Sequence, residues 1–216
     1  MIEFKGVKIY WLGHAGFKIK NRLTIYVDPY KIEPGETGDL ILITHDHYDH
    51  LSIEDISKIS SEETIVIATK HCEGKLSGKF KFRIVGPGDM LEVKGVKVEA
   101  IPAYNVKPDR LGFHPRGKGY VGYIIELDRV RIYHAGDTDF IPEMKNINVD
   151  VALLPVSGTY VMDYKEAVEA AKAVRPELAI PMHYGTIVGG LGDAERFKGA
   201  VEKEGIRVEI LEKEKP

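Results

Sequence analysis

The 216-residue sequence has little of what marks exported, membrane-bound or nucleic-acid-binding proteins. Its single cysteine, Cys72, excludes an internal disulfide and fits a reducing compartment. No apolar run is long enough to cross a membrane, and the first residues lack the apolar core of a signal peptide. A formal net charge of −3 argues against a basic face for nucleic acid. We therefore expect a cytoplasmic protein with neither membrane nor nucleic acid as a partner.

Glutamine is absent as well, whereas charged residues make up 29% of the chain. A composition poor in thermolabile side chains and rich in ions indicates a heat-loving source. The length suffices for a sizeable core and no stretch resembles a linker, so we predict one domain over residues 1–216. A homo-oligomer stays open.

Metal-ligating side chains are concentrated in one short segment. His45, His47, Asp49 and His50 directly follow Leu40–Ile43, an apolar run typical of a buried strand. In an extended segment His45 and His47 project to the same side and can reach one ion, while Asp49 and His50 can face a second ion. Imidazole and carboxylate suit zinc and other borderline divalent cations. The segment therefore predicts a dinuclear metal site.

These four residues match the signature H-x-H-x-D-H, and in this the chain resembles the metallo-β-lactamase superfamily. Asp137 resembles the carboxylate that bridges the two metals in that family, and His183 resembles its last histidine ligand. Within the superfamily the chain resembles the branch of small hydrolases that also contains the L-ascorbate-6-phosphate lactonases. The resemblance implies an α/β fold of four layers, an αβ/βα sandwich of two mixed sheets with outer helices.

The resemblance also implies roles for the ligands. His45 and His47 would hold the first ion and Asp137 would span both ions. Asp49, His50 and His183 would hold the second ion. Two divalent ions, most simply zinc with manganese or iron as alternatives, would produce hydroxide at neutral pH and polarise the bond under attack. Asp49 is the expected catalytic residue, because a carboxylate oxygen can orient that hydroxide.

One position departs from the family pattern. Asn105 stands where family members usually place a histidine, the third ligand of the first metal. Either the first site has fewer protein ligands, or His114 takes this place, or the preferred ion is harder than zinc. Both His114 and Asn105 therefore remain candidates.

Further residues are candidates for supporting roles. Asp28 resembles the family position that accepts the second N–H of a ligating imidazole, and His14 either lines the cleft or is structural. The last set comprises possible substrate-binding residues: Arg110, Arg116, Tyr160 and Tyr184. The two arginines lie in a loop whose basic charge suits a small anionic substrate, although an ordinary solvated loop explains it equally well.

An internal echo supports the architecture. Residues 16–26 resemble residues 122–133, and each hairpin leads to an apolar strand that begins with Asp39 or Asp150. This echo predicts two similar halves, each a mixed sheet with outer helices. Two helices are predicted, one capped by Asp163 and ending at Pro176, the other running from Asp193 to Gly205. The predicted strands are residues 7–12, 16–20, 23–27, 40–44, 64–68, 90–93, 96–101, 119–127, 130–134, 151–155, 178–182 and 207–211.

We predict a metal-dependent hydrolase that uses a metal-bound hydroxide on a small, anionic ester, lactone or phosphodiester. Two alternatives are a nuclease or RNA-processing phosphodiesterase of the same fold, and a non-enzymatic regulatory protein with a degenerate metal site. The compact, acidic chain argues against the first alternative, and Asn105 is the residue that points to the second.

Overall fold

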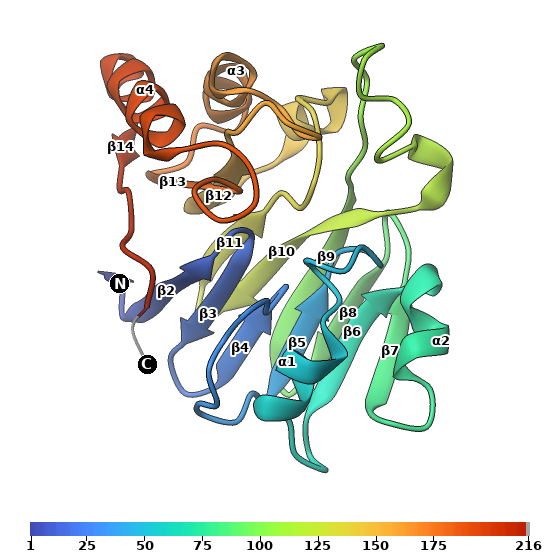
Figure 1. Cartoon of the computed structure of the whole chain (residues 1–216). Helices are drawn as coiled ribbons and strands as arrows, with labels where there is room; N and C mark the ends of the chain where they lie inside the picture. Colours follow the sequence, from blue (N-terminus) through green and yellow to red (C-terminus); the bar gives the residue numbers. More distant parts are fainter. Residues whose placement is uncertain (215–216) are drawn as a thin grey trace. The chain divides into compact units, whose positions relative to one another are not determined.

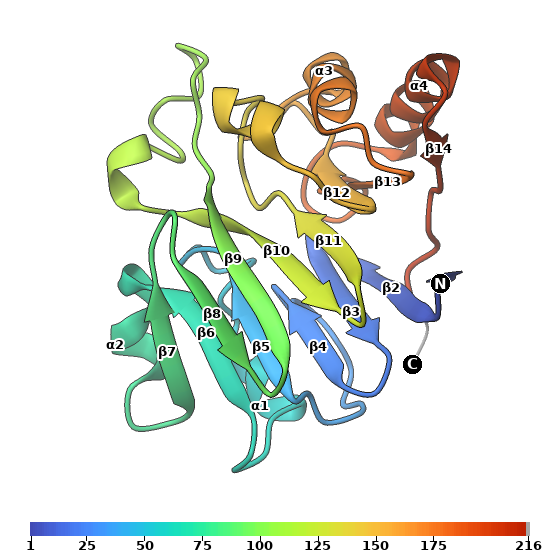
Figure 2. The same cartoon turned by 180° about the vertical axis from the view of Figure 1, so that it is seen from behind.

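A computed structural model describes residues 1–214. The chain divides into two compact units. Unit 1 comprises Met1–Gly86 and the C-terminal segment from Leu211, and unit 2 comprises Pro87–Ile210. Within the described residues each unit has one seven-stranded mixed sheet (Figure 1, Figure 2). The single domain expected from the length stays a prediction.

The sheet of unit 1 follows the order of the chain. Its strands are β1 (Ile2–Phe4), β2 (Val7–Gly13), β3 (Gly16–Lys20), β4 (Thr24–Val27), β5 (Leu40–Ile43), β6 (Ile65–Thr69) and β7 (Lys81–Val85). The first four strands pair antiparallel, and β4 to β7 pair parallel. Parallel strands need crossover connections, and these carry the helices α1 (Ile53–Lys58) and α2 (Glu73–Leu76), the latter preceded by the short η1 (Lys70–Cys72).

Both helices of unit 1 lie on one face of its sheet (Figure 1, Figure 2). The core on this side packs Ile41 and Ile43 of β5 against Ile56 of α1 and Leu76 of α2. The residues of β5 that alternate with these, Leu40 and Leu42, are buried too, so the strand reads as the continuous apolar run typical of a parallel sheet.

The sheet of unit 2 repeats this plan. Its strands are β8 (Met90–Val93), β9 (Val96–Pro102), β10 (Val121–Leu127), β11 (Val130–His134), β12 (Val151–Pro155), β13 (Leu178–Met182) and β14 (Arg207–Val208). β8 to β11 pair antiparallel, and β11 to β14 pair parallel. The helices are α3 (Tyr164–Val174), which contacts β12, and α4 (Leu191–Val201), which contacts α3, β13 and β14. Short turns of helix are η2 (Arg116–Lys118), η3 (Pro142–Asn146) and η4 (Glu202–Glu204).

The internal echo of the sequence corresponds to this repeated plan. In unit 1 the Asp39 carboxylate accepts a hydrogen bond from the Thr24 N–H at 3.0 Å, and in unit 2 Asp150 accepts one from the Arg131 N–H at 2.8 Å. Each aspartate thus fixes the start of the parallel strand that follows it to the start of the preceding hairpin strand. The two sheets confirm the expected α/β fold with two mixed sheets and helices.

Local signals account for both ends of α3. Asp163 caps this helix, its carboxylate accepting from the N–H groups of Lys165 and Glu166, and the Glu166 side chain accepts from the Asp163 N–H in return. Arg175 ends the helix in the left-handed conformation just before Pro176. The second predicted helix is α4, which begins at Leu191, two residues before the expected start.

The sequence prediction missed two strands and misjudged one. β1 and β7 are edge strands, and β7 alternates exposed Lys81 and Arg83 with partly buried residues, so neither shows a buried apolar run. The strand predicted over residues 207–211 pairs only at Arg207 and Val208. No helix of residues 1–214 is long and apolar enough to cross a membrane.

Candidate functional site

The predicted ligands of unit 1 lie in the loop between β5 and α1. The loop turns back at once, because the N–H groups of His50 and Leu51 both bond to the His47 carbonyl, at 3.1 and 2.8 Å. Ser52 then caps α1, its hydroxyl accepting from the Asp55 N–H. A buried strand on one side and a capped helix on the other therefore hold this segment in one shape.

Asp28, the residue directly after β4, lies where it orients His50. Its buried carboxylate accepts hydrogen bonds from the Thr44 N–H at 2.8 Å, from the Thr44 hydroxyl at 2.6 Å and from His50 Nδ1 at 2.7 Å. Because a carboxylate only accepts, Nδ1 of His50 carries the ring hydrogen and Nε2 keeps a lone pair in the neutral ring. That tautomer is the one a metal ligand needs.

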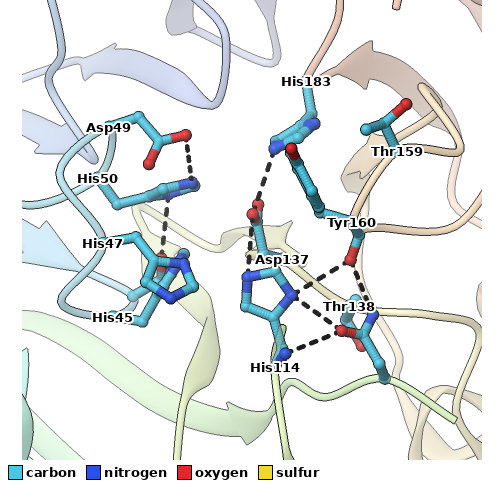
Figure 3. Close-up of polar contacts among 12 residues, drawn as sticks. His45, His47, Asp49, His50, His114, Asp137, Thr138, Thr159, Tyr160 and His183 are labelled. Atoms are coloured by element: carbon cyan, nitrogen blue, oxygen red, sulfur yellow. Dashed lines mark hydrogen bonds and ion pairs between the residues drawn. The ribbon is translucent and has the colours of Figure 1, made fainter. Parts of the chain in front are cut away.

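His45 and His47 direct nitrogen atoms at each other, with His45 Nε2 and His47 Nδ1 2.9 Å apart (Figure 3). The Thr44 hydroxyl gives its hydrogen to Asp28, so it accepts from His45 Nδ1 at 2.9 Å. Nε2 of His45 is therefore a nitrogen with a lone pair. Two ring nitrogens this close share either one proton or one cation, so the pair has the geometry of two ligands to one ion.

His14 joins this cluster, which the sequence did not establish. Its Nε2 lies 3.0 Å from Asp49 Oδ2, and one ligand atom each of His14, Asp49 and His50 lies within 4.8 Å of the others. The His14 carbonyl accepts from the Trp11 indole N–H at 2.9 Å, which fixes the turn after β2. We call His14, His45, His47, Asp49 and His50 the first cluster. The sequence signal for His14 was only a histidine after a strand-end glycine.

The second cluster lies in unit 2 and comprises His114, Asp137 and His183. Asp137 Oδ2 is 3.3 Å from His114 Nε2 and 3.2 Å from His183 Nε2, and Figure 3 shows both rings directed at this carboxylate. All three side chains are buried. Asp137 comes three residues after β11. This strand lies so close to β10 that a Cβ at Gly122 would lie 2.5 Å from the His134 carbonyl oxygen, and only a glycine permits that approach.

Ser157 contacts the ring nitrogen of His183 that points away from Asp137. The Ser157 hydroxyl donates to the Thr159 carbonyl at 3.4 Å, and its oxygen lies 3.1 Å from His183 Nδ1. Nδ1 is then the donor, which leaves the Nε2 lone pair facing Asp137. Ser157 therefore orients the His183 ring, a role that no sequence pattern indicated.

The choice between His114 and Asn105 follows from hydrogen bonds. The buried Asn105 amide oxygen accepts from the His114 N–H at 2.9 Å and from His114 Nδ1 at 3.0 Å. The amide NH₂ donates to Asp139 at 3.1 Å and to the Tyr160 carbonyl at 2.9 Å. Both lone pairs and both hydrogens of the amide are used. This favours His114 as the ligand and gives Asn105 the task of holding its ring.

Asp139 and Arg110 fasten the loop that carries His114. The buried Asp139 carboxylate accepts from the backbone N–H groups of Val106 and Lys107, at 2.8 and 3.0 Å. Arg110 Nε lies 3.1 Å from Asp139 Oδ1, and its Nη2 donates to the two Glu166 carboxylate oxygens at 2.6 and 2.9 Å. No sequence pattern indicated this role for Asp139, although it lies only two residues after Asp137.

Arg110 therefore does not fit the substrate-binding role expected from the sequence. It is buried, and its guanidinium is engaged by Asp139, Glu166 and the Val161 carbonyl at 2.6 Å. Reaching a substrate would mean breaking a buried ion pair. Arg116 is exposed, pairs with Glu143 at 3.0 Å and stacks over the Tyr104 ring at 4.9 Å.

The two candidate tyrosines differ in exposure. Tyr160 is 41% exposed, whereas Tyr184 is 3% exposed. Burial raises the pKa of Tyr184 to about 12, so its hydroxyl stays protonated at neutral pH and can only donate or accept as a neutral group.

Four of the ten described non-glycine residues with positive φ belong to the site or hold it. They are His14, Asp28, Tyr160 and His183, with φ of 53°, 44°, 68° and 60°. Asp and His adopt this region more readily than most residues, so Tyr160 is the most strained of the four. Such strain persists where the surroundings determine the conformation, and it is frequent at functional sites.

The residues present fit divalent metal ions. Imidazole nitrogens with defined lone pairs and carboxylate oxygens are the donors of zinc and similar ions. Cys72 is no part of either cluster; it is buried, contacts Thr69, and burial raises its pKa to about 11. Both clusters offer only imidazole and carboxylate donors and include no thiolate.

The class of protein follows from this fold and from a family comparison. The family model described as a beta-lactamase superfamily domain matches residues 8–183. Two curated relatives are UPF0173 metal-dependent hydrolases, one of Thermoplasma acidophilum with 38% identity over 98% of each chain, the other of Archaeoglobus fulgidus with 33% identity over 95% of each chain. The chain belongs to the UPF0173 metal-dependent hydrolase family of the metallo-β-lactamase superfamily, and it is an enzyme of that kind.

Two solved structures are similar to this fold. A protein from Parabacteroides distasonis is 35% identical, with a TM-score of 0.86 over 95% of this chain and 94% of that one. A metallo hydrolase from the hyperthermophilic archaeon Ignicoccus hospitalis is 29% identical, with a TM-score of 0.80 over 97% and 96% of the two chains. These similarities confirm the metallo-β-lactamase fold. The narrower resemblance to L-ascorbate-6-phosphate lactonases stays a prediction.

Proposed function

We propose that the two clusters act together as one dinuclear metal site. His45, His47 and His114 would hold the first ion, Asp49, His50 and His183 the second, and Asp137 both. Support comes from the side chains that accept a hydrogen bond from Nδ1 of His45, His50, His114 and His183. Each of these contacts fixes the tautomer of the ring and leaves a lone pair on Nε2. Zinc suits these donors best, with manganese or iron as alternatives.

The proposal rests above all on the two imidazole nitrogens that lie beside the Asp137 carboxylate. Its Oδ2 lies 3.3 and 3.2 Å from the Nε2 atoms of His114 and His183, and Asn105 and Ser157 hold the hydrogens of both rings on the opposite nitrogen. Three electron-rich atoms this close repel one another unless a positive charge lies between them. A metal ion would supply that charge.

We propose that the reaction is hydrolysis of a small ester, lactone or phosphodiester. Bound divalent ions would supply ionised water as the nucleophile and polarise the oxygen under attack. The chain's own groups orient the participants: Asp28, Asn105 and Ser157 fix the imidazoles, while His14 positions Asp49 Oδ2 at 3.0 Å. Asp49 is the proposed catalytic residue, because its carboxylate can accept a hydrogen bond from the attacking water.

A small anionic molecule remains the proposed substrate class, on a narrower basis than the sequence offered. Of the two arginines proposed to bind it, only Arg116 is exposed, and it already pairs with Glu143. The cytoplasmic location and the heat-loving source remain predictions from the sequence, and a homo-oligomer stays open.

Metal analysis combined with a substrate panel tests this function. We expect the purified protein to bind two equivalents of zinc and to hydrolyse at least one of a p-nitrophenyl ester, a lactone and bis-p-nitrophenyl phosphate. Chelation should abolish turnover and added zinc should restore it. His47→Ala and Asp137→Ala should abolish turnover while leaving the circular dichroism spectrum unchanged.

The control is His71→Ala, which removes an exposed histidine outside both clusters and should leave metal content and turnover unchanged. A protein that binds no divalent ion, or variants of His47 or Asp137 that keep wild-type turnover, would contradict the proposal. Full metal content without turnover of any of the three would instead contradict the proposed substrate class.

A further inference from the structure

Most of the exposed apolar residues of unit 2 lie in loops that carry or hold ligands of the second cluster. The structure describes all of this unit, and its exposed large apolar residues are Met90, Val106, Leu111, Phe113, Tyr160, Ile187 and Leu191. Val106, Leu111, Phe113, Tyr160 and Ile187 come from the loops that carry or hold His114 and His183, whereas Leu191 begins α4. Single exposed apolar residues are ordinary on protein surfaces, whereas exposed apolar side chains in contact with one another mark a binding surface.

Phe113 and Tyr160 form the part of this surface that is tied to a ligand. Their rings pack edge to face with centroids 4.6 Å apart, and both side chains are more than 40% exposed. Phe113 directly precedes His114, and the Tyr160 carbonyl accepts from His114 Nδ1 at 3.2 Å and from Asn105 at 2.9 Å. In Figure 3 the Tyr160 side chain runs from beside His114 toward His183.

The backbone conformation of Tyr160 shows that its surroundings fix this position. Its φ of 68° is strained for a tyrosine and is held by the hydrogen bonds to its carbonyl. Two positive charges of the neighbouring loop are meanwhile engaged by one acid, Glu166. Arg110 is buried against Glu166, and Lys107 Nζ lies 3.5 Å from the same carboxylate. The loop thus presents apolar groups to solvent and keeps these cations occupied.

We propose that Phe113 and Tyr160 form an apolar wall that binds an acyl chain or aromatic ring of the substrate beside its reacting group. The inference rests on the proposed hydrolytic function, and it narrows the substrate class to molecules with an apolar part next to the scissile bond. The flat ring faces favour such groups because apolar surface is removed from water on both sides of the contact.

Binding of straight-chain carboxylates tests the wall without depending on turnover. Acetate, butyrate, hexanoate and octanoate are titrated calorimetrically into the zinc-loaded protein. We expect affinity to rise about two- to fourfold for each methylene that reaches the wall, with an increasingly negative heat-capacity change. The p-nitrophenyl esters of the same acids should show the same rise in kcat/KM.

Single substitutions show whether the two rings themselves bind the chain. Phe113→Ala and Tyr160→Ala should lower the ratio of hexanoate to acetate affinity about tenfold, with acetate binding itself little changed. Tyr160→Phe keeps the ring and should keep the ratio. Met90→Ala, the matched control, removes an exposed apolar side chain outside these segments and should change nothing.

Equal affinity for acetate and hexanoate in the wild-type protein overturns the proposal. So does a Tyr160→Phe variant that loses as much of the ratio as Tyr160→Ala, because the hydroxyl would then be the binding group. Chain-length dependence of carboxylate binding without turnover of any ester supports the wall while the hydrolytic function fails. Turnover that is indifferent to chain length leaves the function standing and removes the wall.

Discussion

Replacing Asn105 with alanine tests how the His114 ligand is held. The buried amide oxygen accepts both the His114 N–H and the ring Nδ1, at 2.9 and 3.0 Å. Without it the backbone N–H loses its acceptor, and the ring keeps only the longer contact to the Tyr160 carbonyl at 3.2 Å. A buried donor left without a partner costs about 1–3 kcal/mol, so we expect the free energy of unfolding to fall by about 2 kcal/mol.

Metal affinity should fall as well. A ligand ring that is no longer oriented by its hydrogen-bond partner typically costs about 10–100-fold in affinity. Competition with a chromophoric chelator measures this change for zinc, and urea unfolding measures the stability. His114→Ala should lose one equivalent of metal outright, whereas Asn105→Ala should keep both equivalents at reduced affinity.

Asn105→Asp sharpens the test, since it preserves the acceptor for His114 but sets a second carboxylate at the position 3.1 Å from Asp139 Oδ1. It should lower the free energy of unfolding, because the two carboxylates repel each other, but it should keep the zinc affinity that depends on the His114 ring. Asn146→Ala, which replaces an exposed asparagine of the same unit, is the matched control. The reasoning is refuted if Asn105→Ala loses one full equivalent of zinc while His114→Ala keeps both, because Asn105 would then be the ligand.

Two further predictions concern Arg110 and Cys72. Arg110→Leu should lower the free energy of unfolding by about 3–5 kcal/mol, as expected when one partner of a buried ion pair is removed, whereas Arg196→Leu, which breaks an exposed pair, should cost about 1 kcal/mol or less in the same urea titration. Unchanged stability with a raised KM for an anionic substrate would return Arg110 to substrate binding. Burial raises the pKa of Cys72 from 9.0 to about 11, so the unfolded chain loses this proton at a lower pH than the folded protein does. The free energy of unfolding should therefore fall as pH rises from about 9 to about 11, and this thiol should cause no pH dependence below pH 9. The urea midpoint should therefore fall less between pH 8 and pH 11 in Cys72→Ala than in the wild type, and an equal fall in both would contradict this.

Local patterns sufficed for much of the fold. The apolar run Leu40–Ile43 predicted β5, and the cap and acid of Asp163 and Glu166 predicted the start of α3, because both signals depend on neighbouring residues only. The edge strand β7 carries charges on its exposed side and shows no such run. Its strand character comes from pairing with β6, which the segment alone does not reveal.

For the candidate site the sequence determined the residue types and, through the H-x-H-x-D-H segment, the kind of ion they suit. It did not determine which nitrogen of each ring carries the hydrogen, since that depends on Asp28, Ser157 and Asn105, which lie 22, 26 and 9 positions from their histidines.

The tertiary structure also distinguishes between residues that the sequence left open. Asn105 and His114 share one loop and one set of hydrogen bonds, yet only the imidazole directs a nitrogen at Asp137. Arg110 has the charge of a substrate-binding residue but lies buried against Asp139 and Glu166. The sequence itself sets which groups are available, whereas burial and hydrogen-bond partners, which arise only when distant segments pack, decide which groups remain able to act.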